Sequence, residues 1–236
     1  MIDWTGTYCG DAPSAATWAA RWNGDPLLIA LLAGAALAVT RLAPERRLAG
    51  FGAIAALAIT FLSPLCALSV ALFSARSVHH LLLIGVAAPL LAAALPARRA
   101  LPIGAAFALS TGTLWGWHLP AAYDAALANK GIYWAMQASL LGTAWLYWDA
   151  VRRAPVPLGL TFVGAGAAQM GLLGALLTFV TQPLYASHLS TTAAFGIGPV
   201  VDQQLAGLVM WVVGLLPYAV VGAALARGAW RRMATA

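Results

Sequence analysis

The feature that most constrains this chain is a succession of seven apolar runs, each long enough to cross a bilayer as a helix. One crossing takes about 20 residues, and a helix is expected because lipid offers backbone groups no hydrogen-bond partners. None of the runs has the alternating polarity of a membrane β-strand. The sequence therefore predicts an all-α integral membrane protein, a bundle of seven transmembrane helices. The predicted spans are residues 25–42, 48–65, 78–96, 101–119, 131–150, 157–181 and 202–226.

The composition favours the same class. Of 236 residues, 62% are hydrophobic and only 8% are charged, whereas a soluble domain has about 25% charged residues. The net charge of +6 would suit a nucleic-acid partner, but the basic residues lie in pairs between apolar runs. That arrangement is typical of membrane topology. We therefore expect the lipid bilayer as a partner and no nucleic acid.

The basic residues also predict an orientation. Ten of them follow the first, third, fifth and seventh runs, against three elsewhere in the chain. Because cytoplasmic connections carry the excess of arginine and lysine, the N-terminus is expected outside and the C-terminus in the cytoplasm. The ten are Arg41, Arg46, Arg47, Arg98, Arg99, Arg152, Arg153, Arg227, Arg231 and Arg232.

Three regions follow from this topology. Residues 1–24 are expected to form an outer N-terminal tail, residues 25–226 the transmembrane domain, and residues 227–236 a basic cytoplasmic tail. Trp18 and Trp22 are four residues apart and share one face of a helical turn. Since tryptophan is enriched at membrane interfaces, the tail is predicted to contain a short interfacial helix.

Small residues recur inside the sixth run. Ala167, Gly171 and Ala175 are spaced by four residues, and such spacing allows helices to approach closely. No internal repeat is visible, which argues against a transporter built from inverted repeats.

All four histidines are predicted to lie on the outer side. His79 and His80 open the third run, His118 closes the fourth, and His188 lies in the long connection before the seventh. Imidazole binds copper, zinc and haem iron, and polar groups at membrane depth are functional candidates. His80 and His118 can share one metal if their helices face each other. Because His79 and His80 are about 100° apart on a helix, only one is expected to point into the bundle. The alternative is a set of interfacial histidines that bind loops or water.

Other polar residues share the outer side. Cys9 and Cys66 can form a disulfide or bind copper, and the sequence does not choose between these. Asp202 can cap the seventh span, and Asp202 or Asp124 can pair with Arg76. Gln203 adds a hydrogen-bonding group beside Asp202, and both residues, with Arg76, can instead bind a cofactor.

The common enzyme signatures are absent. The chain contains no G-x-S-x-G, no H-E-x-x-H, no phosphate-binding glycine loop and no C-x-x-C. With seven acidic residues in all, it offers few groups for acid–base chemistry. The prediction is a protein that is not an enzyme and has no catalytic residues.

Three segments resemble a known family. They are Ser63-Pro-Leu65 with Leu72-Phe-Ser-Ala75, His80-Leu-Leu-Leu83 and Pro89-Leu-Leu91; Trp117-His-Leu-Pro-Ala-Ala-Tyr-Asp124; and Asp202-Gln-Gln-Leu-Ala-Gly-Leu-Val-Met-Trp211. Together they resemble the multi-spanning CtaG type of cytochrome c oxidase assembly factor, from about Trp22 to the seventh run. The resemblance implies a bacterial inner-membrane protein that helps to mature a haem–copper oxidase at its copper centres.

The chain departs from the family pattern in two places. Family members typically read His-Met-x-x-His before the Leu-Leu-Leu, where this chain has Arg76, Ser77 and His80. They also tend to carry histidines at the start of the fifth span, where this chain has Tyr133 and Trp134. The planar fork of Arg76 suits an anion such as a haem propionate or a partner carboxylate. The positions that carry over are His80, His118, Asp202 and Gln203.

These observations lead to one functional hypothesis and two alternatives. The hypothesis is an assembly factor, a chaperone of the respiratory chain, that binds copper at the periplasmic face through His80 and His118 and passes it to a cytochrome c oxidase subunit. The first alternative is a haem-binding or haem-handling protein with the same histidines as axial ligands and Arg76 on a propionate. The second is a metal-free docking subunit of the oxidase. The residues expected to complete a copper site are Cys66, His79 and His188.

Overall fold

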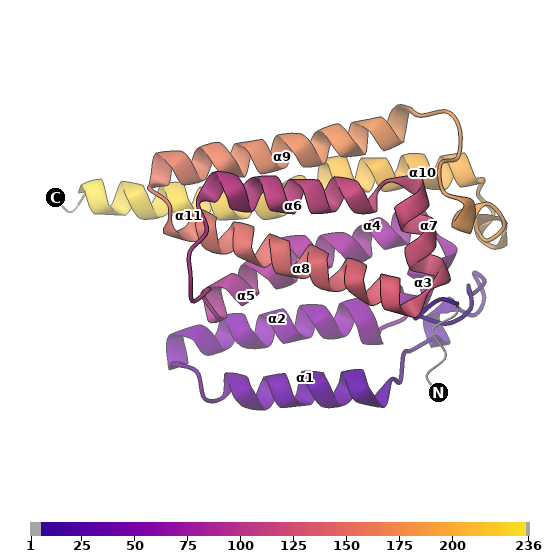
Figure 1. The fold of residues 1–236 in the computed structure, drawn as a ribbon, viewed down its shortest axis with the longest axis horizontal. Helices are drawn as coiled ribbons and strands as arrows, with labels where there is room; N and C mark the ends of the chain where they lie inside the picture. The colour runs from indigo at the N-terminus through magenta and orange to yellow at the C-terminus, as the bar shows by residue number, and fades with distance from the viewer. Residues whose placement is uncertain (1–5, 235–236) are drawn as a thin grey trace.

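The computed structural model describes residues 6–234, and within that range it consists of helices and their connections (Figure 1). The all-α prediction is confirmed. The helices are α1 (Pro26–Val39), α2 (Pro44–Leu62), α3 (Leu65–Ala71), α4 (Phe73–Leu81), α5 (Ala88–Ala94), α6 (Ile103–Trp117), α7 (Pro120–Ala128), α8 (Lys130–Arg153), α9 (Val156–Phe179), α10 (Pro199–Leu208) and α11 (Leu215–Ala234). π-helical turns join α4 to α5 (Leu82–Ala87) and α10 to α11 (Val209–Val213).

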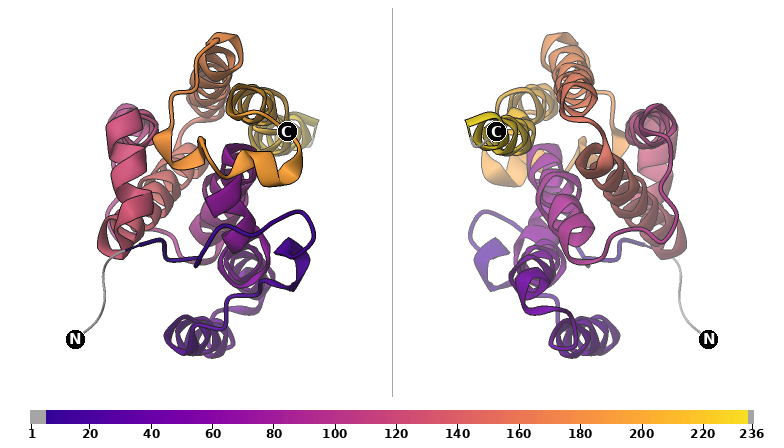
Figure 2. Two further views of the ribbon diagram at one scale, coloured as in Figure 1. Left: turned by 90° about the vertical axis from the view of Figure 1, so that its right-hand side faces the viewer. Right: turned by 90° about the vertical axis from the view of Figure 1, so that its left-hand side faces the viewer.

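The long helices lie side by side with alternating direction, so their connections gather at two ends (Figure 1). One end carries the N-terminal segment, α7 and the connection 180–198, which lie across the helix ends in Figure 2. This is the histidine end, because it holds His79, His80, His118 and His188. The connections 40–43, 95–102 and 154–155 and the end of α11 form the opposite, arginine end. Chain segments far apart in sequence therefore meet at each end.

The structure has fewer helices able to span a membrane than the seven that were predicted. Each predicted run coincides with a helix or a joined pair, but only three stretches are long and apolar enough within residues 6–234: Phe73–Ala94, Val156–Phe179 and Pro199–Ala234. A fourth is α2 with α3, if this pair, bent by 47°, counts as one span. Seven spans are not supported. The helices α1 and α6 have 14 and 15 residues, short of the roughly 20 needed, and tyrosine, tryptophan and polar residues lower the hydropathy of α8.

The structure adds detail to the two predicted tails. The helix in the N-terminal tail is a single 3₁₀ turn, Trp18–Ala20, and Trp22 lies beyond it with 69% of its surface exposed. At the other end α11 runs to Ala234, so residues 227–234 continue a helix. Residues 1–5 and 235–236 lie outside the described range.

The helix α8 packs against α5, α6, α7 and α9. Its buried residues recur every three or four positions, at Tyr133, Met136, Leu140, Ala144 and Trp148, which places them on one helical face. Trp148 donates from Nε1 to the carbonyl of Ile84 at 2.8 Å, inside the first π-helical turn. By contrast α1 packs on α2 at the edge of the bundle (Figure 2).

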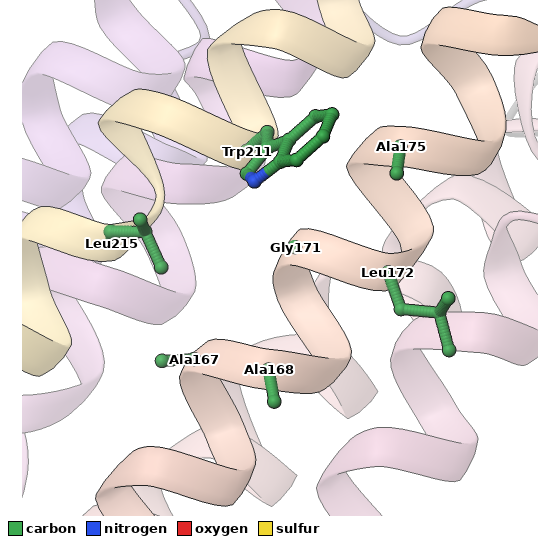
Figure 3. Close-up of a pocket in the computed structure, with 7 residues that line it drawn as sticks. All are labelled: Ala167, Ala168, Gly171, Leu172, Ala175, Trp211 and Leu215. Carbon is green, nitrogen blue, oxygen red and sulfur yellow. The ribbon is translucent and has the colours of Figure 1, made fainter.

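The small residues of α9 face the second π-helical turn. Ala167, Gly171 and Ala175 on α9 line a hollow of about 400 Å³. Figure 3 shows them opposite Trp211. Two helices approach closely beside this hollow, where a Cβ on Gly174 would stand 2.7 Å from the Gly207 carbonyl oxygen. Glycine is required there because two backbones meet.

This contact generates the first prediction. Gly174→Ala should lower the stability of the detergent-purified protein by about 1–3 kcal/mol, because the added methyl group overlaps the backbone of α10. The matched control is Gly164→Ala on the same helix, where a Cβ would meet nothing within 4 Å. That control should be neutral or stabilising, since alanine favours helix over glycine. Equal melting temperatures for the two variants would contradict this packing.

Candidate functional site

The candidate site is built on the start of α4. Leu72 has extended backbone angles (φ −127°, ψ 131°) and breaks the helix between α3 and α4, so the first N–H groups of α4 have no partners within the helix. Asp202 of α10 supplies the missing acceptor. Its carboxylate accepts hydrogen bonds from the Phe73 amide at 2.6 Å, from the Ser74 amide at 3.2 Å and from the Ser74 hydroxyl. The sequence predicted a cap on its own helix or a pair with Arg76. Asp202 instead caps a helix about 130 residues away in the chain.

Gln203 has a similar role beside it. Its Oε1 accepts from the Leu184 amide at 2.8 Å, and its Nε2 donates to the Gln182 carbonyl at 3.2 Å. Gln203 therefore ties the connection after α9 to α10. Asp202 and Gln203 were predicted to bind a cofactor. In the structure both side chains form hydrogen bonds with protein groups, and they position the site.

The structure brings His80 and His118 together. Their ring centroids are 6.0 Å apart, and the residues are 3% and 7% exposed. His118 directs Nδ1 to the Leu114 carbonyl at 2.7 Å, so its neutral ring has the free lone pair on Nε2. Neither nitrogen of His80 has a hydrogen-bond partner within the described residues. Two buried imidazoles, one from α4 and one from the residue after α6, are therefore neighbours.

His79 is buried as well as His80, which corrects the expectation that only one of them points into the bundle. His79 is fully buried and its Nε2 lies 3.5 Å from the Tyr133 hydroxyl of α8. Its ring packs edge-on against Phe61 of α2, with centroids 5.1 Å apart. The reason is that α4 lies inside the bundle, so more than one of its faces is covered. The rings of His79 and His80 are 5.8 Å apart.

His188 lies on the other side of an aromatic ring. Asp124 fixes its backbone turn by accepting from the amides of Ala186 and Ser187 at 3.1 and 3.0 Å. The His188 Nε2 is 2.8 Å from the Tyr123 hydroxyl. The Phe73 ring contacts both His188 and His118, at centroid distances of 5.9 and 6.3 Å. His188 is therefore separated from the His80–His118 pair. The Asp124 carboxylate accepts hydrogen bonds from the turn and forms no ion pair with Arg76 within the described residues.

Arg76 is a buried cation without a carboxylate partner. It is 1% exposed, and its guanidinium carbon lies 5.3 Å from the centre of the Tyr133 ring. Its Nε and Nη1 have no hydrogen-bond partner, and no ion pair to Arg76 occurs within residues 6–234. The buried polar groups of Ser77 in α4 and Gln137 in α8 also have no partner in the described part of the chain. Arg76 and the histidines beside it form a histidine–arginine cluster. Because unpaired buried donors are costly, this cluster is suited to a bound group or to water.

Cys66 is joined to Cys9 by a disulfide, one of the two alternatives left open by the sequence. A disulfide sulfur is not a thiolate, so Cys66 offers no metal ligand in this form. No group of three or more histidine, cysteine, aspartate or glutamate side chains with metal-binding geometry occurs in the described part of the chain. The residues present therefore fit an ion held by two imidazoles, and not a closed site of three or four ligands.

The sequence reasoning missed several residues of the cluster. Tyr123 lies in the Trp117–Asp124 segment, but it was not singled out. Tyr133 was noted only as a departure from the family pattern. The signal for Gln137 was a carboxamide inside an otherwise apolar run. No sequence pattern marked Phe73 as part of the site, because its place between two histidines depends on the packing of α4 against the 180–198 connection.

Fold and cluster define a class: an all-helical protein with helices able to span a membrane and a buried histidine–arginine cluster at one end. The model of the cytochrome c oxidase caa3 assembly factor family (Caa3_CtaG) matches residues 29–232. The chain belongs to this family, as the three sequence segments predicted. No curated protein and no solved structure matches the chain. A family of assembly factors indicates a role without catalysis.

The cap on α4 generates a prediction. Asp202→Ala should lower stability by at least about 2 kcal/mol, because two buried amides of α4 lose their acceptor. Asp11→Ala is the control, since Asp11 is exposed and its side chain makes no hydrogen bond within residues 6–234. Thermal unfolding in detergent compares the two. Asp202→Ala melting like the wild type would show that α4 does not depend on this carboxylate.

His188 generates a pH prediction. Burial, aided by the charge of Arg76, lowers the pKa of His188 from 6.5 to about 4. A depressed histidine pKa means that the unfolded chain takes up a proton first, so stability falls as pH drops from 6.5 towards 4. The loss due to His188 is about 2 kcal/mol at pH 5.

The measurement is the melting temperature of wild type and His188→Gln between about pH 7.5 and 5. The variant should show the smaller loss on acidification, because it lacks the group that must be protonated. Parallel pH profiles for the two proteins would exclude His188 as a contributor.

Proposed function

We propose that this protein carries copper, as cargo, between His80 and His118 and delivers it to a subunit of cytochrome c oxidase. The observation that carries the proposal is the pair of buried rings, with both nitrogens of His80 unpaired opposite His118. A centroid separation of 6.0 Å leaves room for an ion bound to one nitrogen of each ring, with bonds of about 2 Å. Membership of the assembly-factor family supports cytochrome c oxidase as the recipient of the copper.

The charge and number of ligands favour Cu(I) over Cu(II). Cu(II) prefers four ligands in a tetragonal arrangement, and the described residues offer two imidazoles. The uncompensated charge of Arg76 repels a divalent ion twice as strongly as a monovalent one at the same distance. A site with two neutral ligands beside a cation holds its ion weakly, which suits transfer to a partner.

The same proposal includes an orientation in the bacterial inner membrane. The histidine end faces the periplasm and the arginine end faces the cytoplasm, as the excess of arginine at one end supports. The antiparallel helices bring the arginine-bearing connections to the same end (Figure 1). Copper is then received and passed on at the outer face, where the oxidase subunit meets the protein.

A metal-free docking role is the second candidate, and Arg76 is the observation that favours it. A buried guanidinium with two nitrogens that have no partner within the described residues can bind a carboxylate from a partner subunit as a charge-assisted pair. The haem alternative is weaker. His80 and His118 lie among packed aromatic rings and are at most 7% exposed, so a porphyrin requires the helices to separate.

The test is copper binding by the detergent-purified protein. Cu(I) is kept reduced with ascorbate and titrated in competition with a chelator of known affinity. We expect about one ion per chain, with each of His80→Ala and His118→Ala weakening binding at least tenfold, a change of about 1.4 kcal/mol. His188→Gln is the matched control and should bind as the wild type does.

Unchanged affinity in both alanine variants would exclude the His80–His118 site. Purification of a metal-free protein together with the oxidase would then favour docking through Arg76. Iron with a reducible Soret band would favour haem.

A further inference from the structure

The N-terminal segment covers the cluster at the histidine end. Tyr8 stacks on Tyr133 with ring centroids 5.3 Å apart and meets Trp134 edge-on at 4.7 Å. The next residue, Cys9, is bonded to Cys66 of α3. The segment therefore lies on Tyr133, the residue of α8 that borders His79, and the disulfide fastens it there.

The disulfide is the first member of a row of potential ligands. The Cys9 sulfur is 3.6 Å from the Tyr133 hydroxyl, and that hydroxyl is 3.5 Å from Nε2 of His79. From His79 the ring centroids step by 5.8 Å to His80 and by 6.0 Å to His118. The row leads from the partly exposed Cys9 to the fully buried histidines.

We propose that Cys9 and Cys66, when reduced, form the entry site for Cu(I), and that the disulfide closes this entry. The inference rests on the proposed function, in which the His80–His118 pair holds the ion. Soft thiolates select Cu(I), and the two Cα atoms are 5.3 Å apart, so both sulfurs can bind one ion. The pair supplies the anionic ligands that the histidine cluster lacks.

The opening step is a thiol–disulfide exchange with a dithiol reductant. A thiolate of the reductant attacks the sulfur of Cys9, because Cys66 is fully buried and Cys9 is partly exposed. The disulfide bond breaks, Cys66 leaves as a thiolate, and a mixed disulfide forms on Cys9. The second thiolate of the reductant then displaces Cys9. Two electrons pass from the dithiol to the protein, and the reductant is left as a disulfide.

When the disulfide forms again, the ion is released from the cysteines towards the histidines. Bound Cu(I) takes the place of the two thiol protons, and the thiolates hold it more tightly than neutral imidazoles do. When a disulfide oxidant accepts two electrons from the two cysteines, the S–S bond forms again and the thiolate ligands are lost. The ion is then left to the histidines next in the row. Tyr8 keeps the segment in place in both states, because its hydroxyl also donates to Asp25 at 2.6 Å.

The experiment compares Cu(I) affinity in three forms of the full chain. They are the wild type with its disulfide intact, the wild type reduced with a phosphine that is removed under anaerobic conditions, and the Cys9→Ser/Cys66→Ser variant. We expect reduction to tighten binding of the wild type at least a hundredfold. The serine variant should bind like the oxidised wild type, with or without reductant.

Reduced wild type that binds no more tightly than the serine variant would overturn the entry site. Circular dichroism checks that each form remains helical. The comparison of oxidised with reduced wild type needs no substitution, so it decides the question even if the double variant fails to fold.

Histidine variants separate this inference from the proposed function. In reduced His80→Ala the tight thiolate binding should remain, whereas oxidised His80→Ala should lose copper. If oxidised His80→Ala keeps its copper, the proposed function fails, whatever the cysteines do. If reduction changes nothing while oxidised His80→Ala loses copper, the histidine site stands and the entry site fails.

Discussion

The cap that Asp202 places on α4 is the interaction on which the rest of the site depends. A helix that begins inside a bundle has amide groups with neither water nor a preceding turn to accept from them. The carboxylate from α10 accepts from two of these amides. This bond fixes where α4 starts and how it is turned about its axis. The side chains of Arg76, His79 and His80 follow within the next two turns, so their positions depend on it.

Charge is unevenly distributed in the cluster, and this shapes what it can hold. Asp202 and Asp124 lie at the histidine end, but both are occupied by backbone amides. Arg76 is therefore left without an ion pair beside the imidazoles. A buried cation with neutral neighbours disfavours a divalent metal and favours an anion or a monovalent soft ion. The thiolates of Cys9 and Cys66 are the groups nearby that can reverse this balance, and only in the reduced state.

Much of the fold and part of the site were predictable. The apolar runs predicted the long helices, although α1 and α6 proved shorter than a span and α11 extends beyond the predicted end at 226. The short helices α3 and α7 were not predicted. The pairing of His80 with His118 followed from their places at the ends of consecutive runs. The burial of His79 did not follow, because a helix inside a bundle has no single inward face. The cap from Asp202 to Phe73 was also missed, because a local reading assigns a capping residue to its own helix.

The sequence by itself determined that this chain is helical, where its helices lie and which end is rich in arginine or in histidine. These properties depend on composition and on hydrogen bonds between residues a few positions apart. Only the tertiary structure decided that Cys9 bonds to Cys66, that Asp202 caps α4 and that Arg76 is left without an acid. Such contacts join residues 57 to 129 positions apart. They form only where packing brings two helices or a connection together, and no local pattern in the sequence encodes that distance.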